Sequence, residues 1–229
     1  MAGTGHLDGW CHAIQHGPPF LVVPSAYLLH PSISQHPSDT LCEFSFSSLP
    51  HLAYLDLSFN ELFVIIPPQI GNLSKLQFLS LHANDFSGII PPEICLLTRL
   101  ERKCPKLGTL SVSMNSTTGG IPCKIGKSSH LHAFDLLFNH LFGEIPNELG
   151  KLNSLTKLIL KWNQFTGRLP LEISSFSKLE DLDLSIIRFS SSIPESLGKL
   201  LKLHYLDLSK NLFFQELPKD LEKVVQLSE

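Results

Sequence analysis

Two consecutive stretches of this chain show the same pattern of residue types, 24 positions apart. The pattern places asparagines at Asn139 and Asn163 within residues 131–170, LHAFDLLFNHLFGEIPNELGKLNSLTKLILKWNQFTGRLP. Each asparagine follows an alternating apolar segment and precedes an apolar residue, a glycine and an apolar-proline pair. A fixed period of this length predicts stacked structural units, because one such unit cannot bury its own apolar face.

Each part of the pattern has a physical role. In the L-x-L segment two apolar side chains point to one face of a strand, which predicts one buried and one solvated face. The asparagine is expected to turn inward, where its amide can donate to and accept from backbone groups that the strand leaves unpaired. Glycine tolerates a tight backbone and proline cannot extend a hydrogen-bonded ladder, so both shape the return of the chain.

The register predicts seven units between residues 49 and 223. We expect their asparagines to form a buried ladder of Asn60, Asn84, Asn115, Asn139, Asn163 and Asn211. The strands should be parallel and centred near Leu55, Leu79, Leu110, Phe134, Leu158, Leu182 and Leu206. Residues 224–229 are interpreted as the start of a truncated eighth unit.

Several units depart from the pattern. An insertion at about residues 97–103 places Asn115 31 positions after Asn84 rather than 24. Thr117 replaces an apolar residue in the same unit, so we expect this third unit to be the weakest of the stack. Ile187 occupies an asparagine position in the sixth unit, which should leave backbone groups unpaired at a cost of about 1–3 kcal/mol.

The first 48 residues show no repeat register. They are rich in His, Pro, Ser and Gly and are interpreted as an irregular segment or a degenerate cap. Cys11, His12 and His16 would form part of a metal site if this segment were helical. A chance association is the favoured interpretation, because no second Cys or His pair completes a tetrahedral set.

Composition narrows the function classes. With 43% hydrophobic residues the chain is rich enough in apolar side chains for a sizeable core. A net charge of −3 without a run of like charges argues against nucleic acid as a partner. The apolar run from Pro19 to Leu29 is too short to span a bilayer and lacks the basic start of a signal peptide, so we expect no membrane insertion by this chain itself.

The cysteines do not reveal the cellular compartment. The chain contains five of them in no C-x-x-C pair, and their disulfide pairing stays open. They are Cys11, Cys42, Cys95, Cys104 and Cys123.

Longer segments show a more specific motif, L-x-x-L-x-x-L-D-L-S-x-N-x-L-x-G-x-I-P-x-x-L-G-x-L. It occurs in LAYLDLSFNELFVIIPPQIGNL and in LHYLDLSKNLFFQELPKDL. The motif resembles the plant-type leucine-rich repeat of receptor-like kinases and receptor-like proteins. This resemblance implies an α/β repeat solenoid, a right-handed leucine-rich-repeat superhelix with one short parallel strand per 24-residue repeat.

The resemblance also implies a function. Ectodomains of this class bind a peptide ligand, a small molecule, a partner receptor or a co-receptor at the cell surface, pass the signal to an intracellular kinase, and act in development or defence. The chain departs from the family because it contains no kinase motif and no transmembrane segment, and its GWC only faintly resembles a paired-cysteine cap. It is therefore interpreted as an ectodomain fragment. The alternatives are a secreted enzyme inhibitor, as in plant inhibitors of polygalacturonase, and a non-functional truncated product.

The sequence shows no catalytic constellation, and we predict a binding module without cofactor or metal rather than an enzyme. The repeated aspartates of the L-D-L segments are interpreted as solvated strand positions. Outward strand positions instead predict a concave binding face with apolar residues in its middle and charges around them. Its candidate residues are Asp135, Leu137, Phe138, Ile159, Lys161, Trp162, Asp183, Tyr205 and Asp207.

Two N-glycosylation triplets occur, at Asn72 and Asn115. Asn115 belongs to the inward ladder and should be inaccessible after folding. Asn72 lies on the return segment and is the credible acceptor if the chain is secreted.

Overall fold

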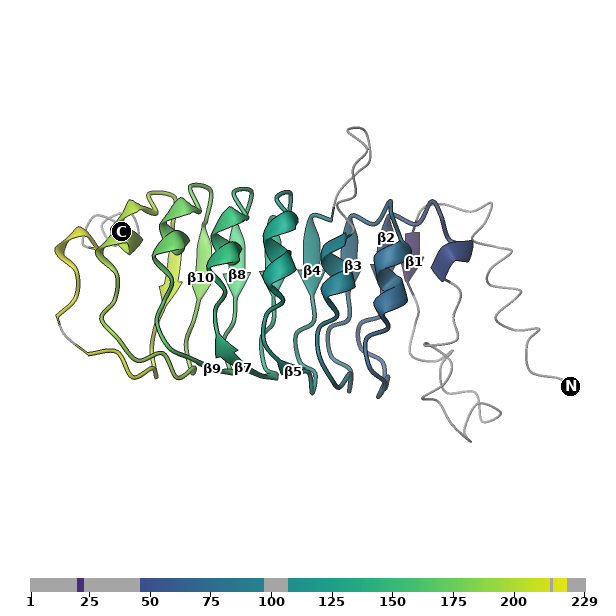
Figure 1. The fold of residues 1–229 in the computed structure, drawn as a ribbon, viewed down its shortest axis with the longest axis horizontal. Helices are drawn as coiled ribbons and strands as arrows, with labels where there is room; N and C mark the ends of the chain where they lie inside the picture. Colours follow the sequence, from purple (N-terminus) through teal and green to yellow (C-terminus); the bar gives the residue numbers. More distant parts are fainter. Residues whose placement is uncertain (1–19, 23–45, 97–106, 215, 222–229) are drawn as a thin grey trace, which may run out of the picture.

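The computed structural model describes residues 20–22, 46–96, 107–214 and 216–221. These residues form an elongated stack of similar coils, with strands along one side and short helices along another (Figure 1). Each coil covers the apolar face of its neighbour, so the arrangement is the solenoid that the 24-residue period predicts.

Eight parallel strands form the main sheet, in the order β1-β2-β3-β4-β6-β8-β10-β11. Seven of them are centred on the apolar residues that the sequence predicts, and their central residues lie opposite one another across neighbouring strands. The prediction of parallel strands in this register is therefore confirmed. The strands are β1 Phe20–Val22, β2 Tyr54–Asp56, β3 Phe78–Ser80, β4 Thr109–Ser111, β6 Ala133–Asp135, β8 Lys157–Ile159, β10 Asp181–Asp183 and β11 Tyr205–Asp207.

Within residues 1–48, which the sequence indicates to be irregular, the structure describes one short strand. Phe20–Val22 pairs in parallel with β2, so this short piece extends the main sheet by one strand. The sequence did not reveal this strand, because the asparagine and glycine that identify the later units are absent after Val22. The candidate metal ligands Cys11, His12 and His16, the insertion at 97–103 and the segment 224–229 lie outside the described residues.

A second sheet was not predicted by the sequence. It contains three short parallel strands, β5 Thr118–Gly119, β7 His140–Glu144 and β9 Gln164–Thr166, and lies along another edge of the stack (Figure 1). These strands follow the ladder asparagines of the third, fourth and fifth units. Gly119, Gly143 and Gly167 adopt φ of 77°, 86° and 81° there, a conformation that glycine enters without steric strain.

Short 3-10 helices form the return side of the coils. Proline precedes five of them in extended conformation, and the first residue after each of these five donates its backbone N–H to the helix, which ends the turn. The helices are η2 Phe46–Ser48, η3 Pro68–Asn72, η4 Pro92–Leu96, η5 Cys123–Lys127, η6 Asn147–Lys151, η7 Leu171–Ser175, η8 Glu195–Lys199 and η9 Lys219–Leu221.

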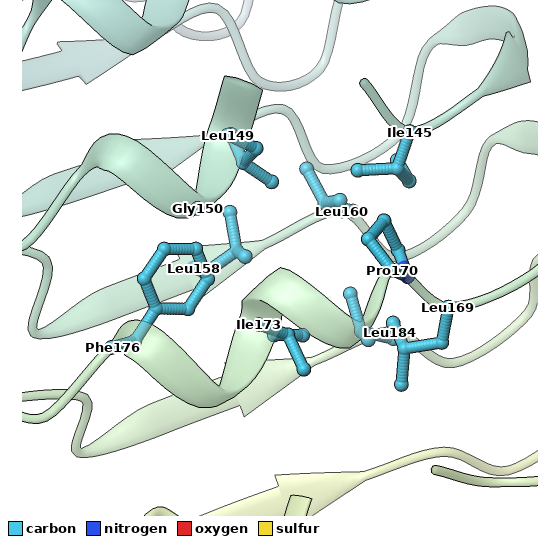
Figure 2. A pocket seen from close by; sticks show the side chains of 10 residues that line it. All are labelled: Ile145, Leu149, Gly150, Leu158, Leu160, Leu169, Pro170, Ile173, Phe176 and Leu184. Carbon is cyan, nitrogen blue, oxygen red and sulfur yellow. The ribbon is translucent and has the colours of Figure 1, made fainter. Parts of the chain in front are cut away.

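One continuous apolar core fills the space between strands and helices. Figure 2 shows its middle, where Leu158 and Leu184 from the strand side lie near Ile173 and Phe176 from the helix side. Each fully buried side chain of this size contributes about 1.5–3 kcal/mol by leaving water. The small space that these apolar residues surround is a packing gap of the core, and we assign no ligand to it.

The asparagines connect successive coils by hydrogen bonds. The amide nitrogen of Asn163 donates to the backbone oxygen of Leu160 in its own coil at 2.9 Å and of Leu136 in the preceding coil at 2.8 Å. Its amide oxygen accepts the backbone N–H of Leu141 at 3.1 Å. The same contacts to the preceding coil recur at Asn84, Asn115, Asn139 and Asn211. Asn60, the first member, bonds the oxygens of its own coil.

Two substituted positions show how the stack accommodates departures from the pattern. Ile187, in the asparagine position of the sixth unit, is only 4% exposed and packs into the core. Thr117 is fully buried, but its hydroxyl and its backbone N–H both donate to the amide oxygen of Asn139. The polar substitution at Thr117 is therefore satisfied by the ladder itself.

Candidate ligand-binding surface

The outward face of the main sheet is organised in rows, because equivalent residues of successive strands lie side by side. One row lies immediately before the asparagine positions, and all seven of its members have a left-handed backbone with φ between 52° and 57°. This conformation was not anticipated from the sequence, since only glycine and asparagine enter it readily. The row consists of Phe59, Ala83, Met114, Phe138, Trp162, Ile186 and Lys210.

The middle of this face exposes large apolar side chains, as the sequence suggests. Phe138 and Trp162 are 52% and 47% exposed, and their ring centroids lie 5.7 Å apart. Leu137 and Ile159 are partly exposed beside them. We name these four residues the central shelf. A contiguous exposed group with two aromatic rings is costly in water and typical of a contact surface.

A lysine and two carboxylates lie on the C-terminal side of the shelf. The Nζ of Lys161 lies 3.4 Å from Oδ2 of Asp183 and 3.7 Å from Oδ2 of Asp207. Desolvation is the largest single effect on Lys161 and lowers its pKa, but the charge and hydrogen bond of Asp183, together with Asp207 and Tyr205, raise the pKa of Lys161 overall. The ammonium is thus paired within the chain.

Two further groups beside Lys161 have shifted pKa values. Hydrogen bonding from Ser209 is the main cause that lowers the pKa of Asp207, against a smaller opposing effect of desolvation. The negative charge of Asp183 is the main cause that raises the pKa of the exposed Tyr205. The structure therefore places Lys161, Asp183, Tyr205 and Asp207 in one electrostatically coupled cluster.

The aspartates of the L-D-L segments share one local contact. Each uses Oδ1 to accept the backbone N–H two residues later, at 2.9–3.1 Å, which leaves Oδ2 for other partners. These aspartates are Asp56, Asp135, Asp183 and Asp207. Aspartate recurs at this position because its carboxylate accepts that backbone N–H, a contact that the sequence pattern does not reveal.

The N-terminal half of the same face has a different character. Tyr54 and Phe78 stack with ring centroids 4.1 Å apart. Four residues after Phe78, Nδ1 of His82 lies 2.8 Å from the hydroxyl of Ser113, which lies 2.8 Å from the hydroxyl of Ser111. Ser113 is fully buried, so this network orders the sheet surface.

Apolar side chains are also exposed on the side of the second sheet. The sequence pattern did not indicate them, because it did not predict the strands that orient them. They include Phe63, Ile65, Ile89 and Phe142.

The two glycosylation triplets differ in accessibility. Asn72 ends η3 with an exposed side chain, whereas Asn115 is 6% exposed and its amide nitrogen donates to three backbone oxygens. Among the cysteines, Cys95 lies in the core, where burial raises the pKa of its thiol to about 11, and Cys123 is exposed. The other three lie outside the described residues.

The described part of the chain contains no group of three or more His, Cys, Asp or Glu side chains placed to hold a metal ion. Within the same residues, no helix combines the length and the apolar character needed to cross a bilayer.

Comparisons with known proteins identify the repeat. A profile described as leucine rich repeat matches residues 35–86, and a second one matches residues 154–176 and 202–224. The chain is a leucine-rich-repeat protein. No curated protein matches this leucine-rich-repeat chain by sequence.

Solved structures similar to this leucine-rich-repeat protein include plant receptor ectodomains. A TDR receptor is 38% identical, with a TM-score of 0.72, over 78% of this chain and 30% of the receptor. PEPR1 in complex with AtPEP1 is 32% identical, with a TM-score of 0.71, over 78% and 24%.

The Arabidopsis receptor kinase HAESA, solved with the peptide hormone IDA and the co-receptor SERK1, is 30% identical, with a TM-score of 0.71, over 78% and 29%. The resemblance to plant receptor-kinase ectodomains is thereby confirmed. The chain spans less than a third of the length of these three proteins.

Proposed function

We propose that this chain is a non-catalytic binding module, part of the extracellular ectodomain of a plant receptor kinase or receptor-like protein, and that its central shelf binds a peptide ligand. The observation that supports this most directly is the exposure of the adjacent rings of Phe138 and Trp162 in the middle of the sheet face. Burying such rings on a partner is a common source of binding free energy.

The similar proteins support the ligand class. PEPR1 was solved with AtPEP1, and HAESA with a peptide hormone and a co-receptor. An extended peptide can lie across several coils and present alternate side chains to the same face. A co-receptor protein is the second partner that we propose for an ectodomain of this kind, in signal perception during development or defence.

Localisation and modification follow from the same proposal. We place the chain outside the cell or at the plasma membrane, with a glycan on Asn72. The exposed side chain of Asn72 supports this assignment.

The experiment is a selection of random displayed peptides on the immobilised full chain, followed by affinity measurement of the peptides obtained. Phe138→Ser and Trp162→Ser should each weaken binding about tenfold, because truncating a buried aromatic anchor typically costs more than about 1 kcal/mol. Phe142→Ser is the matched control, since this phenylalanine is similarly exposed but belongs to the second sheet. The proposal fails if no peptide is obtained or if only the control variant loses binding.

A further inference from the structure

Of the four equivalent aspartates on the sheet face, Asp183 and Asp207 are ion-paired, whereas Asp56 and Asp135 are not within the described residues, and of the latter two only Asp135 lies beside the central shelf. Asp183 and Asp207 each direct Oδ2 toward Lys161, so their charges are partly neutralised within the chain. Asp135 has the same Oδ1 contact, to the N–H of Leu137 at 3.0 Å, but the described residues provide its Oδ2 with neither an ion pair nor a hydrogen bond. Asp135 is thus held in place by the fold while its second oxygen stays available.

Asp135 lies directly beside the central shelf. It is opposite Ile159 in the β6–β8 register and two residues before Leu137 on its own strand. On its other side it is opposite Ser111 of β4, whose side chain is small. Lys157, two residues before Ile159 on β8, forms no ion pair with Asp135 in the described structure.

The charges of this region favour a cationic partner. Asp135, Asp183 and Asp207 provide three carboxylates against the single ammonium of Lys161, so this group carries two negative charges. The pairing of Lys161 with two carboxylates also makes it a weaker receptor for an anionic ligand group. An ion pair beside an apolar surface is screened less than one in open water.

We propose that the ligand of this face is a peptide with a basic side chain near an apolar one, and that Oδ2 of Asp135 pairs with that basic side chain. This inference rests on the proposed peptide-binding function and specifies its ligand. Arginine fits best, because its stem can pack along Ile159 while its planar guanidinium donates to the carboxylate. The neighbouring apolar residue of the peptide covers Phe138 and Trp162.

The test uses the peptides that the full chain selects from the random library. They should be enriched in Arg or Lys close to an aromatic or aliphatic residue. Asp135→Asn should weaken their binding about tenfold. The asparagine oxygen can still accept the N–H of Leu137, so this substitution removes the charge and keeps the local hydrogen bond. Asp56→Asn is the matched control, because Asp56 makes the same backbone contact far from the shelf.

A charge exchange provides the sharper readout. Asp135→Arg should abolish binding of the selected basic peptide and should restore binding, at least tenfold, to the same peptide with glutamate in place of its basic residue. Peptides that need Phe138 and Trp162 but show no basic preference, and bind Asp135→Asn unchanged, would overturn this inference and leave the proposed function standing. Failure to select any shelf-dependent peptide would overturn both.

Discussion

The side-chain amide of Asn163 donates to the backbone oxygen of Leu136, 27 positions earlier in the chain, at 2.8 Å. This hydrogen bond joins two consecutive coils through residues that are distant in the sequence. Because the amide oxygen also accepts from the preceding coil, each ladder asparagine after the first fixes the position of the coil before it. The central shelf depends on this order, since Phe138 and Trp162 lie immediately before two ladder asparagines.

The interrupted ladder at Ile187 gives the first prediction. Asparagine at this position would reach the backbone oxygens of Leu160 and Leu184 and the N–H of Phe165, by analogy with its neighbours. These hydrogen bonds, about 0.5–1.5 kcal/mol each, should outweigh the lost burial of the isoleucine. We expect Ile187→Asn to raise the free energy of unfolding by about 1 kcal/mol in urea titrations. Ile187→Val should lower it by about 0.5–1.5 kcal/mol, and an asparagine variant less stable than the unmodified chain would contradict the prediction.

Backbone strain at Ile186 gives the second prediction. This β-branched residue has a φ of 55°, where asparagine costs less than isoleucine. Ile186→Asn should therefore raise the thermal midpoint, by an amount equivalent to about 1 kcal/mol. Ile186→Val keeps the branch and should bring no gain. Equal midpoints for the asparagine and valine variants in calorimetry would show that the strain is compensated elsewhere.

The buried hydroxyl of Ser128 gives the third prediction. Ser128 is fully buried and its Oγ has no hydrogen-bond partner among the described residues, at a position where other coils have Leu73, Leu152 or Leu200. Ser128→Ala removes an unsatisfied polar group and should stabilise the fold by about 1–2 kcal/mol. Ser192→Ala, at an exposed position, should change the unfolding free energy by less than about 0.5 kcal/mol. A destabilised Ser128→Ala would mean that the hydroxyl does have a partner.

Glycosylation gives the fourth prediction. Secreted from plant cells behind a heterologous leader, the chain should gain a glycan at Asn72 and none at Asn115. Asn72→Gln should remove the glycosidase-sensitive mass, and Asn115→Gln should leave it in place while lowering stability, because Asn115 bonds two coils. Mass spectrometry of the tryptic peptides checks both sites. A glycan on Asn115 would show that modification precedes folding of this coil.

The sequence predicts the strand register well because the strands depend on local period-two patterning, whose central apolar residue recurs every 24 positions at Phe134, Leu158 and Leu182. It also points to Phe138 and Trp162, since outward positions follow directly from that register. It does not predict the left-handed backbone before each asparagine, the second sheet or the open oxygen of Asp135. The second sheet and the surroundings of Asp135 depend on contacts between coils, which a pattern within one coil does not contain.

The most direct test of the proposed binding surface uses the fluorescence of Trp162. The chain has two tryptophans, so Trp10→Phe leaves Trp162 as the single reporter, and its ring is 47% exposed. Saturation with a selected peptide should shift the Trp162 emission to shorter wavelength and protect it from acrylamide quenching, because the ligand covers the ring. Peptide binding that leaves both the emission and the quenching of Trp162 unchanged would contradict the assignment of the central shelf as the ligand site.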